Sequence, residues 1–168
     1  MDLKNRPRIG VVGPSVCSPE VWNLAREVGF LIAREGGILI CGGRSGVMEA
    51  AASGAKQAGG VTVGILPGRT ASEANSSIDI PIVTDMGHAR NVINVLTSQV
   101  IIAVHGAYGT LSEIALALAC GRPVVGLQTW SLTPPEGSLP PSVMLARTAA
   151  EAVASAFRLI RETPPQPR

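Results

Sequence analysis

Aromatic side chains are scarce in this sequence, with two Trp, one Tyr and two Phe among 168 residues. Proteins bind single-stranded nucleic acids largely by stacking the bases on aromatic rings, so this scarcity disfavours such a partner. Charge disfavours it too, because 14 basic and 12 acidic side chains leave a net charge of +2 with no basic cluster. The sequence therefore predicts no nucleic-acid partner.

Cysteines and long apolar runs are also few. Cys17, Cys41 and Cys120 are far apart, and neither His lies at metal-ligand spacing from a Cys or a carboxylate, so we expect neither disulfides nor a metal site. The longest apolar run, residues 114–120, is far too short to span a membrane, and residues 1–10 lack the apolar stretch of a signal peptide. We expect a cytoplasmic protein with no membrane partner.

The apolar residues that are present are mainly Val, Ile and Leu, gathered in short runs. These runs do not alternate polar with apolar residues, which is typical of parallel strands buried on both faces. The predicted strands cover residues 9–13, 38–42, 61–67, 78–84, 100–106 and 123–127.

Helix-length segments separate most of these runs. The first predicted helix follows Ser18, its expected N-cap. The second covers residues 47–58, the third begins near residue 88, the fourth covers residues 110–121 and the last covers residues 145–161. The alternation predicts an α/β fold, an open and mostly parallel sheet with helices on both faces. We expect one domain over residues 1–168, with flexible tails at 1–7 and 162–168.

Two segments interrupt this alternation. The link between residues 63 and 82 is rich in Gly, Ser and Asn, which predicts a surface loop without a helix that can act as a lid. Residues 129–142 contain four Pro and are predicted to be irregular.

Glycine clusters follow three predicted strands, at the edge where open α/β sheets bind ligands. They are Gly13-Pro14-Ser15, CGGRSG at residues 41–46 and HGAYG at residues 105–109. In the second cluster, backbone N–H groups at the start of a helix can face an anion, and Arg44 adds a charge. The spacing of this cluster fits neither the GxGxxG motif of dinucleotide-binding proteins, nor a P-loop, nor the GxSxG motif of hydrolases, so these three classes of enzyme are disfavoured. The alternative is that these glycines only turn the chain.

Thr110 and Glu113 have the spacing of a capping box, in which each side chain bonds the other's backbone N–H. A cap needs no ligand, but it does not explain why Gly106 and Gly109 flank Tyr108, a pattern that indicates close approach of the backbone to a bound group. We expect this segment to be both, a helix cap whose amides remain free to face an anion.

Arg90 is predicted in the first turn of the third helix, where a cation opposes the helix dipole by about 0.3–1 kcal/mol. A bound phosphate or carboxylate would reverse that penalty. The alternative is an exposed Arg90 paired with Asp85. His88, two residues earlier, is interpreted as a residue that starts the helix or faces the ligand.

Three stretches together resemble the Lonely-guy (LOG) and molybdenum-cofactor carrier group of Rossmann-like proteins, in the SLOG superfamily. The stretches are CGGRSGVMEAAASGAKQAGG, DIPIVTDMGHARNVINVL and HGAYGTLSEIALALACGRPVVGL. Within the group, the sequence is most similar to the algal-type molybdenum cofactor carriers. The resemblance implies a Rossmann-like three-layer fold that carries the molybdenum cofactor (molybdopterin) or another phosphorylated pterin or nucleotide-like ligand. It also implies a homodimer or homotetramer, with molybdoenzymes as recipients of the cofactor.

The enzyme branch of the group implies an alternative function, hydrolysis of nucleoside 5′-monophosphates such as cytokinin riboside monophosphates or AMP. Its signatures, PGGxGTxxE and H-x-R-K, place the catalytic residues at Glu113 and Arg90. His105, Ala107 and Asn91 depart from them, and the missing Lys removes a charge from the phosphate side. A third reading follows from a distant similarity to DNA-processing proteins, and the composition disfavours it.

These arguments define one set of predicted residues for a ligand, with no metal. The set is Gly13, Ser15, Gly42, Gly43, Arg44, Ser45, Gly46, His88, Arg90, His105, Gly106, Ala107, Tyr108, Gly109, Thr110 and Glu113.

Overall fold

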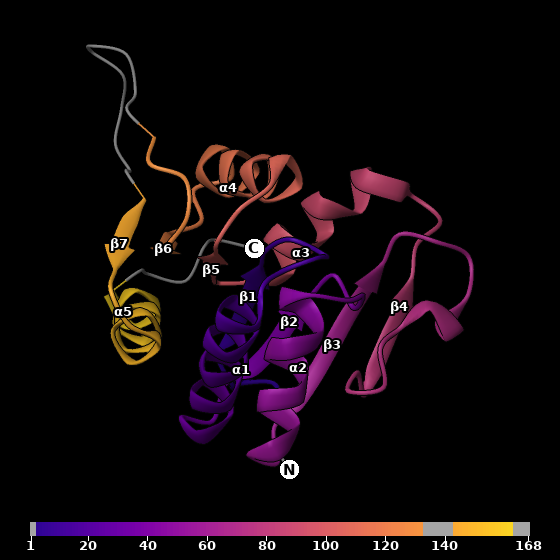
Figure 1. Cartoon of the computed structure of the whole chain (residues 1–168), viewed down its shortest axis with the longest axis horizontal. Coiled ribbons are helices and arrows are strands. Elements are labelled where there is room, and N and C mark those ends of the chain that lie inside the picture. Colours follow the sequence, from indigo (N-terminus) through magenta and orange to yellow (C-terminus); the bar gives the residue numbers. More distant parts are fainter. Residues whose placement is uncertain (1–2, 133–142, 163–168) are drawn as a thin grey trace.

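A single sheet of seven parallel strands forms the centre of the computed structural model, which describes residues 3–132 and 143–162 (Figure 1). The strands lie in the order β4-β3-β2-β1-β5-β6-β7. Their bounds are β1 Arg8–Val12, β2 Ile38–Cys41, β3 Val61–Leu66, β4 Ile80–Val83, β5 Val100–Val104, β6 Val124–Leu127 and β7 Met144–Ala146.

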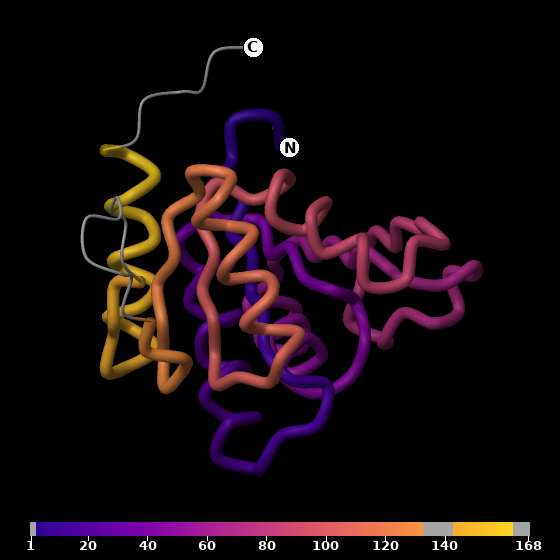
Figure 2. The backbone as a smooth tube through the Cα atoms, turned by 90° about the horizontal axis from the view of Figure 1, so that it is seen from above, coloured from indigo at the N-terminus to yellow at the C-terminus, as the bar shows by residue number. Residues whose placement is uncertain are grey.

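Helices cover both faces of this sheet. Helices α1, α2 and α5 pack on one face, and α3 and α4 on the other (Figure 1). In the view of Figure 2, α5 in yellow lies at the side of the molecule opposite the magenta segment between β3 and β4. The bounds are α1 Pro19–Arg34, α2 Val47–Gln57, α3 Asn91–Thr97, α4 Tyr108–Ala119 and α5 Ala149–Glu162, with short 3-10 helices η1 Ala71–Glu73 and η2 Gly87–Arg90.

The core is aliphatic and lies in two layers, one on each face of the sheet. On β1, Val11 packs in the layer formed with α1, α2 and α5, whereas Val12 packs in the layer formed with α3 and α4. Strands β1, β2, β5 and β6 are almost completely buried, as their unbroken apolar runs predict. Ile114 of α4 is fully buried in the core. No helix in the described part of the chain is long and apolar enough to cross a membrane.

The predicted α/β class is confirmed, and so are six strands and five helices near their expected positions. Ser18 caps α1 as expected, because its hydroxyl accepts a hydrogen bond from Val21 N–H at 3.3 Å. The link from β3 to β4 differs slightly from the prediction of no helix, since η1 adds one 3-10 turn.

Two predictions about strands are wrong. The strand at residues 78–84 was predicted to be buried on both faces, but β4 is an edge strand and its Ile80, Ile82 and Val83 are exposed. Leu145 was predicted in the last helix but lies in β7, and α5 begins at Ala149. Leu favours helices intrinsically, and here pairing of β7 with β6 overrides that preference.

Some predictions fall outside the described residues. They are the tails at residues 1–2 and 163–168 and most of the Pro-rich segment, residues 133–142. Within the predicted N-terminal tail, the Arg6 side chain donates hydrogen bonds to the carbonyls of Gly36 and Gly37.

Helices α1 and α2 approach each other closely through glycine. A Cβ on Gly29 of α1 would overlap the carbonyl oxygen of Ala51, and one on Gly54 of α2 would overlap that of Arg26. The two glycines therefore set the spacing of the helices, and with it the position of the loop that precedes α2.

Gly29→Ala should lower the free energy of unfolding by about 1–3 kcal/mol, because the added methyl group overpacks this contact. The loss is expected although Ala is intrinsically better in helices by about 1 kcal/mol. Chemical denaturation measures it, with Gly109→Ala as the control, since a Cβ there meets no atom within 4 Å. Equal stabilities of the two variants would contradict this packing.

Candidate functional site

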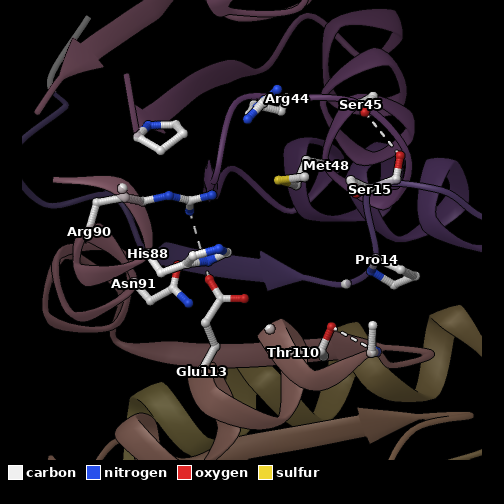
Figure 3. A pocket seen from close by; sticks show the side chains of 15 residues that line it. Pro14, Ser15, Arg44, Ser45, Met48, His88, Arg90, Asn91, Thr110 and Glu113 are labelled. Carbon is white, nitrogen blue, oxygen red and sulfur yellow. Dashed lines mark hydrogen bonds and ion pairs between the residues drawn. The ribbon is translucent and has the colours of Figure 1, made fainter. Parts of the chain in front are cut away.

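A cavity of about 460 Å³ lies where the loops after β1, β2, β3 and β5 meet η2. This is the edge of the sheet at which open α/β folds bind ligands, and the volume suits a small molecule. The lining residues are Gly13, Pro14, Ser15, Arg44, Ser45, Met48, Pro67, Gly87, His88, Arg90, Asn91, Ala107, Gly109, Thr110 and Glu113 (Figure 3).

The cavity brings together most of the predicted binding residues, from four separate segments. Those that line it are Gly13, Ser15, Arg44, Ser45, His88, Arg90, Ala107, Gly109, Thr110 and Glu113. The predicted residues outside its lining are Gly42, Gly43, Gly46, His105, Gly106 and Tyr108.

The first two loops are joined by hydrogen bonds. Val47 N–H donates to the carbonyl of Pro14 at 3.0 Å, and the Ser45 hydroxyl donates to the carbonyl of Ser15, also at 3.0 Å. Gly46 makes this contact possible, because it has φ +68° and a Cβ there would overlap the Pro14 carbonyl oxygen. Gly46 thus holds the two loops together rather than lining the cavity.

Gly42 and Gly43 also lie behind the cavity wall. Gly43 N–H donates to Cys41 Sγ at 3.4 Å, and the Gly43 carbonyl accepts from Asn75 N–H at 2.9 Å. A Cβ on Gly42 would overlap the guanidinium of Arg90. The glycines after β2 therefore make room for Arg90 and do not offer the Gly43 amide to the cavity.

Helix α4 begins two residues earlier than predicted, which changes the roles of Thr110 and Glu113. The N-cap is Ala107, whose side chain accepts no hydrogen bond, and Ala107 N–H donates to Thr110 Oγ1 at 3.4 Å. The predicted capping box between Thr110 and Glu113 is therefore wrong, since Glu113 lies beyond the first turn and faces the cavity. The first amides of α4 have no acceptor within the helix, and Gly109 and Thr110 line the cavity.

Two aromatic rings lie near one another outside the cavity, Tyr108 on this turn and Trp130 in the segment after β6. Tyr108 is 83% exposed, and its ring centroid lies 6.1 Å from that of Trp130. Trp130 packs beside Gly106, and the carbonyl of His105 accepts a hydrogen bond from Thr129. These contacts explain why His105, Gly106 and Tyr108 lie outside the cavity lining.

Arg90, at the junction of η2 and α3, is only 9% exposed. Its Nε and Nη1 atoms are buried and have no hydrogen-bond partner among the described residues. The alternative pairing with Asp85 is wrong, because Asp85 accepts from Arg69 Nε at 3.0 Å. Burial lowers the pKa of the Arg90 guanidinium, and the nearby Glu113 carboxylate partly opposes that shift.

Glu113, on α4, points toward Arg90 (Figure 3). The distance from Arg90 Nη1 to Glu113 Oε1 is 3.9 Å, an ion pair too long for a hydrogen bond. Oε1 instead accepts from Asn94 Nδ2 at 3.0 Å. Burial raises the pKa of the Glu113 carboxyl, while the Asn94 hydrogen bond and the Arg90 charge partly offset the rise.

Sequence reasoning missed Met48, Pro67, Gly87 and Asn94. Met48 and Asn94 lie inside apparently ordinary helices, and Pro67 and Gly87 adjoin the cavity only because β3 and η2 end beside it. Asn91 was noted only as a departure from the enzyme signature, and it lines the cavity.

In the described residues, no group of three or more His, Cys, Asp and Glu side chains is placed to hold a metal ion. Cys41 is a buried core residue, and burial raises the pKa of its thiol to about 11.

The fold is that of a Rossmann-like α/β protein, with a cavity at the carboxyl edge of its sheet. Residues 6–156 match the model of the SLOG cluster4 family. The chain therefore belongs to that family.

Two solved structures are similar over nearly their whole length. The molybdenum cofactor binding protein of Rippkaea orientalis is 38% identical, with 94% of this chain and 99% of that one covered and a TM-score of 0.83. The molybdenum cofactor carrier protein of Chlamydomonas reinhardtii is 41% identical, with 94% and 100% covered and a TM-score of 0.80. A cytokinin riboside 5′-monophosphate phosphoribohydrolase of Mycobacterium tuberculosis is 36% identical over 120 residues, which are 66% of this chain and 64% of that relative.

Glu113→Gln should change how stability depends on pH. Because the folded protein holds the Glu113 proton more tightly than the unfolded chain, wild-type stability should fall as pH rises from about 4.3 through the raised pKa. The variant lacks this fall, so its stability relative to wild type should increase by roughly 1.4 kcal/mol per unit of pKa shift. Denaturant titrations from pH 4 to 8 measure it.

The matched control is Glu27→Gln, which removes a carboxylate from the exposed side of α1. It measures what the loss of an exposed carboxylate alone does to stability over the same range. If the Glu113→Gln difference from wild type did not change with pH, burial would not be controlling the Glu113 carboxyl.

Proposed function

We propose that this protein binds and carries the molybdenum cofactor or another phosphorylated pterin or nucleotide-like ligand. Similarity to a molybdenum cofactor binding protein and to a molybdenum cofactor carrier protein supports this proposal, with nearly complete coverage at 38% and 41% identity. The observation that carries it concerns the buried Arg90 guanidinium that lines the cavity: its Nε and Nη1 atoms have no hydrogen-bond partner in the part of the chain that the structure describes.

Such donors are costly in a protein without a ligand. A buried polar group without a partner destabilises the fold by about 1–3 kcal/mol, and charged groups by more. An anionic oxygen removes this penalty, because charge-assisted hydrogen bonds are about twice as strong as neutral ones. The arrangement of Arg90 is therefore the one expected of a residue that completes its hydrogen bonds with an anion.

Other parts of the cavity fit the phosphate of such a ligand. Gly109 and Thr110 line the cavity and belong to the first turn of α4, where amides without acceptors and the positive end of the helix dipole favour an anion. Arg44 supplies a second cation from the opposite loop. Of the phosphate residues expected from the sequence, Arg90, Gly109 and Thr110 keep that role, and Gly42, Gly43 and Gly46 take a supporting one.

We also propose that the protein is cytoplasmic, that it assembles as a homodimer or homotetramer, and that it delivers the cofactor to molybdoenzymes. The exposed apolar side chains of β4, Ile80, Ile82 and Val83, offer one surface for contact between copies.

Phosphoribohydrolase activity is a second candidate, favoured by the Glu113 carboxylate beside Arg90 in the cavity. With phosphate on Arg90, Glu113 would stabilise an oxocarbenium-like transition state at the ribose or orient the attacking water. The 36% identity to the Mycobacterium tuberculosis phosphoribohydrolase supports this role. Asn91 stands in place of the Lys of the enzyme signature, and the lost positive charge argues against efficient hydrolysis more than against binding.

Arg90→Met should weaken binding of the molybdenum cofactor by about a hundredfold, because it removes charge-assisted hydrogen bonds worth roughly 1.5–3 kcal/mol. Arg90→Lys should restore only part of the affinity, since an ammonium keeps the charge but lacks the planar fork. Equilibrium binding to purified protein, with protection of the cofactor from oxidation as a second readout, measures the effect.

Arg26→Met is the control, because Arg26 is an exposed arginine of α1 that does not line the cavity. Its affinity should equal that of wild type. Saturable binding that is equally strong in wild type and Arg90→Met would contradict the proposed site, and absence of binding to wild type would contradict the function.

Incubation with AMP and cytokinin riboside monophosphates tests the second candidate. If the protein is also a hydrolase, free base should accumulate with wild type and fall about a hundredfold or more with Glu113→Gln, as expected when a catalytic charge is lost. Equal release of base by the two proteins would rule Glu113 out as the catalytic group.

A further inference from the structure

Asn94 is a buried polar residue of α3 that no sequence motif singled out. It is 1% exposed, and its backbone carbonyl accepts a hydrogen bond from the Ser98 hydroxyl at 2.8 Å. Its side-chain Nδ2 donates to Glu113 Oε1 at 3.0 Å, while its Oδ1 is buried without a partner among the described residues. Among the described residues, the one hydrogen bond of this side chain is therefore the one that it donates to the Glu113 carboxylate.

We infer that Asn94 is a positioning residue, which holds Glu113 Oε1 so that Oε2 is presented to the ligand as a hydrogen-bond acceptor. This inference rests on the proposed function and deepens it. It requires a ligand that carries a hydrogen-bond donor, a ring N–H, an amino group or a hydroxyl, close to its anionic group.

The two oxygens of Glu113 have different surroundings. Oε1 accepts from Asn94 and lies 3.9 Å from Arg90 Nη1, whereas Oε2 accepts no hydrogen bond from the described residues. Glu113 lines the cavity, so a ligand can reach the oxygen that is left. An ionised carboxylate only accepts hydrogen bonds, and its partner must therefore be a donor.

The geometry also separates the tasks of Asn94 and Arg90. At 3.9 Å, Arg90 attracts the carboxylate without fixing its orientation, because a hydrogen bond needs about 2.7–3.2 Å. Asn94 supplies the short, directional contact. Arg90 consequently keeps Nε and Nη1 for an anion while Glu113 is held beside it.

Several charged or titratable groups surround Glu113. Arg90 from the η2 end and the Cys41 thiol from β2 interact electrostatically with Glu113, and Arg44 and His88 line the same cavity. The Asn94 hydrogen bond lowers the pKa of Glu113, so its loss raises that pKa further. A change at Asn94 should therefore appear in the pH profile of ligand binding.

Asn94→Leu keeps the approximate shape of the side chain and removes the donor. Binding of two probes is compared by calorimetry at pH 7: inorganic phosphate, which needs only the anion site, and the molybdenum cofactor, which also carries donors. Phosphate affinity should stay within about twofold, and cofactor affinity should fall about tenfold or more. In a Glu113→Gln background, Asn94→Leu should have no further effect on the cofactor.

Asn94→Asp provides a second variant of the same size, which decides the matter if the leucine variant does not fold. Its carboxylate repels Glu113 at pH 8, so cofactor affinity should fall. At lower pH the two facing carboxyl groups share one proton, which restores a hydrogen bond toward Oε1. Cofactor affinity relative to wild type at the same pH should therefore recover as the pH falls, whereas a purely structural defect would persist over the whole range.

The failures of the inference and of the function are distinguishable. Equal weakening of both probes by Asn94→Leu, or unchanged cofactor affinity, overturns the positioning role and leaves the proposed function standing. Absence of phosphate and cofactor binding in wild type overturns both.

Discussion

The guanidinium of Arg90 is the group on which the candidate site depends. It is buried, it lies 3.9 Å from a carboxylate without a direct hydrogen bond, and two of its nitrogens have no partner among the described residues. A charge in that position destabilises a protein that has no ligand, because its hydration is lost and only partly replaced. An anion bound in the cavity would supply the missing partners, as the proposed function requires.

Several contacts of the surrounding fold keep this guanidinium in place beside the cavity. Gly42 leaves the space that Arg90 fills, and Gly46 lets the loop after β2 pack closely against the loop after β1. Asn94 holds Glu113 beside Arg90, so the cavity presents donors and an acceptor on adjacent walls. This combination suits a ligand with an anionic group and a polar ring or sugar, as in a phosphorylated pterin or a nucleotide.

The sequence predicted the edge of the sheet and most residues of the cavity, because glycine clusters after strands and a cation at a helix start are local signals. The same signals misassigned the roles of individual glycines. The Gly43 amide is not free, because it donates a hydrogen bond to Cys41 Sγ. Gly42 does not line the cavity, because the guanidinium of Arg90, 48 positions away in the sequence, packs against it. Asn94 was missed because only the packing of α3 against α4 places it beside Glu113. Strand β7 was missed because it forms through pairing with β6.

The central claim is that an anionic group of the ligand accepts hydrogen bonds from Arg90 Nε and Nη1. The ¹H–¹⁵N resonance of the Arg90 side-chain Nε–H, assigned by comparison with Arg90→Lys, reports on that atom directly during titration with the molybdenum cofactor. The account predicts a shift of this resonance and slower exchange of its proton with water, both saturating with the cofactor. Cofactor binding that leaves the Arg90 Nε–H resonance and its exchange rate unchanged would contradict it.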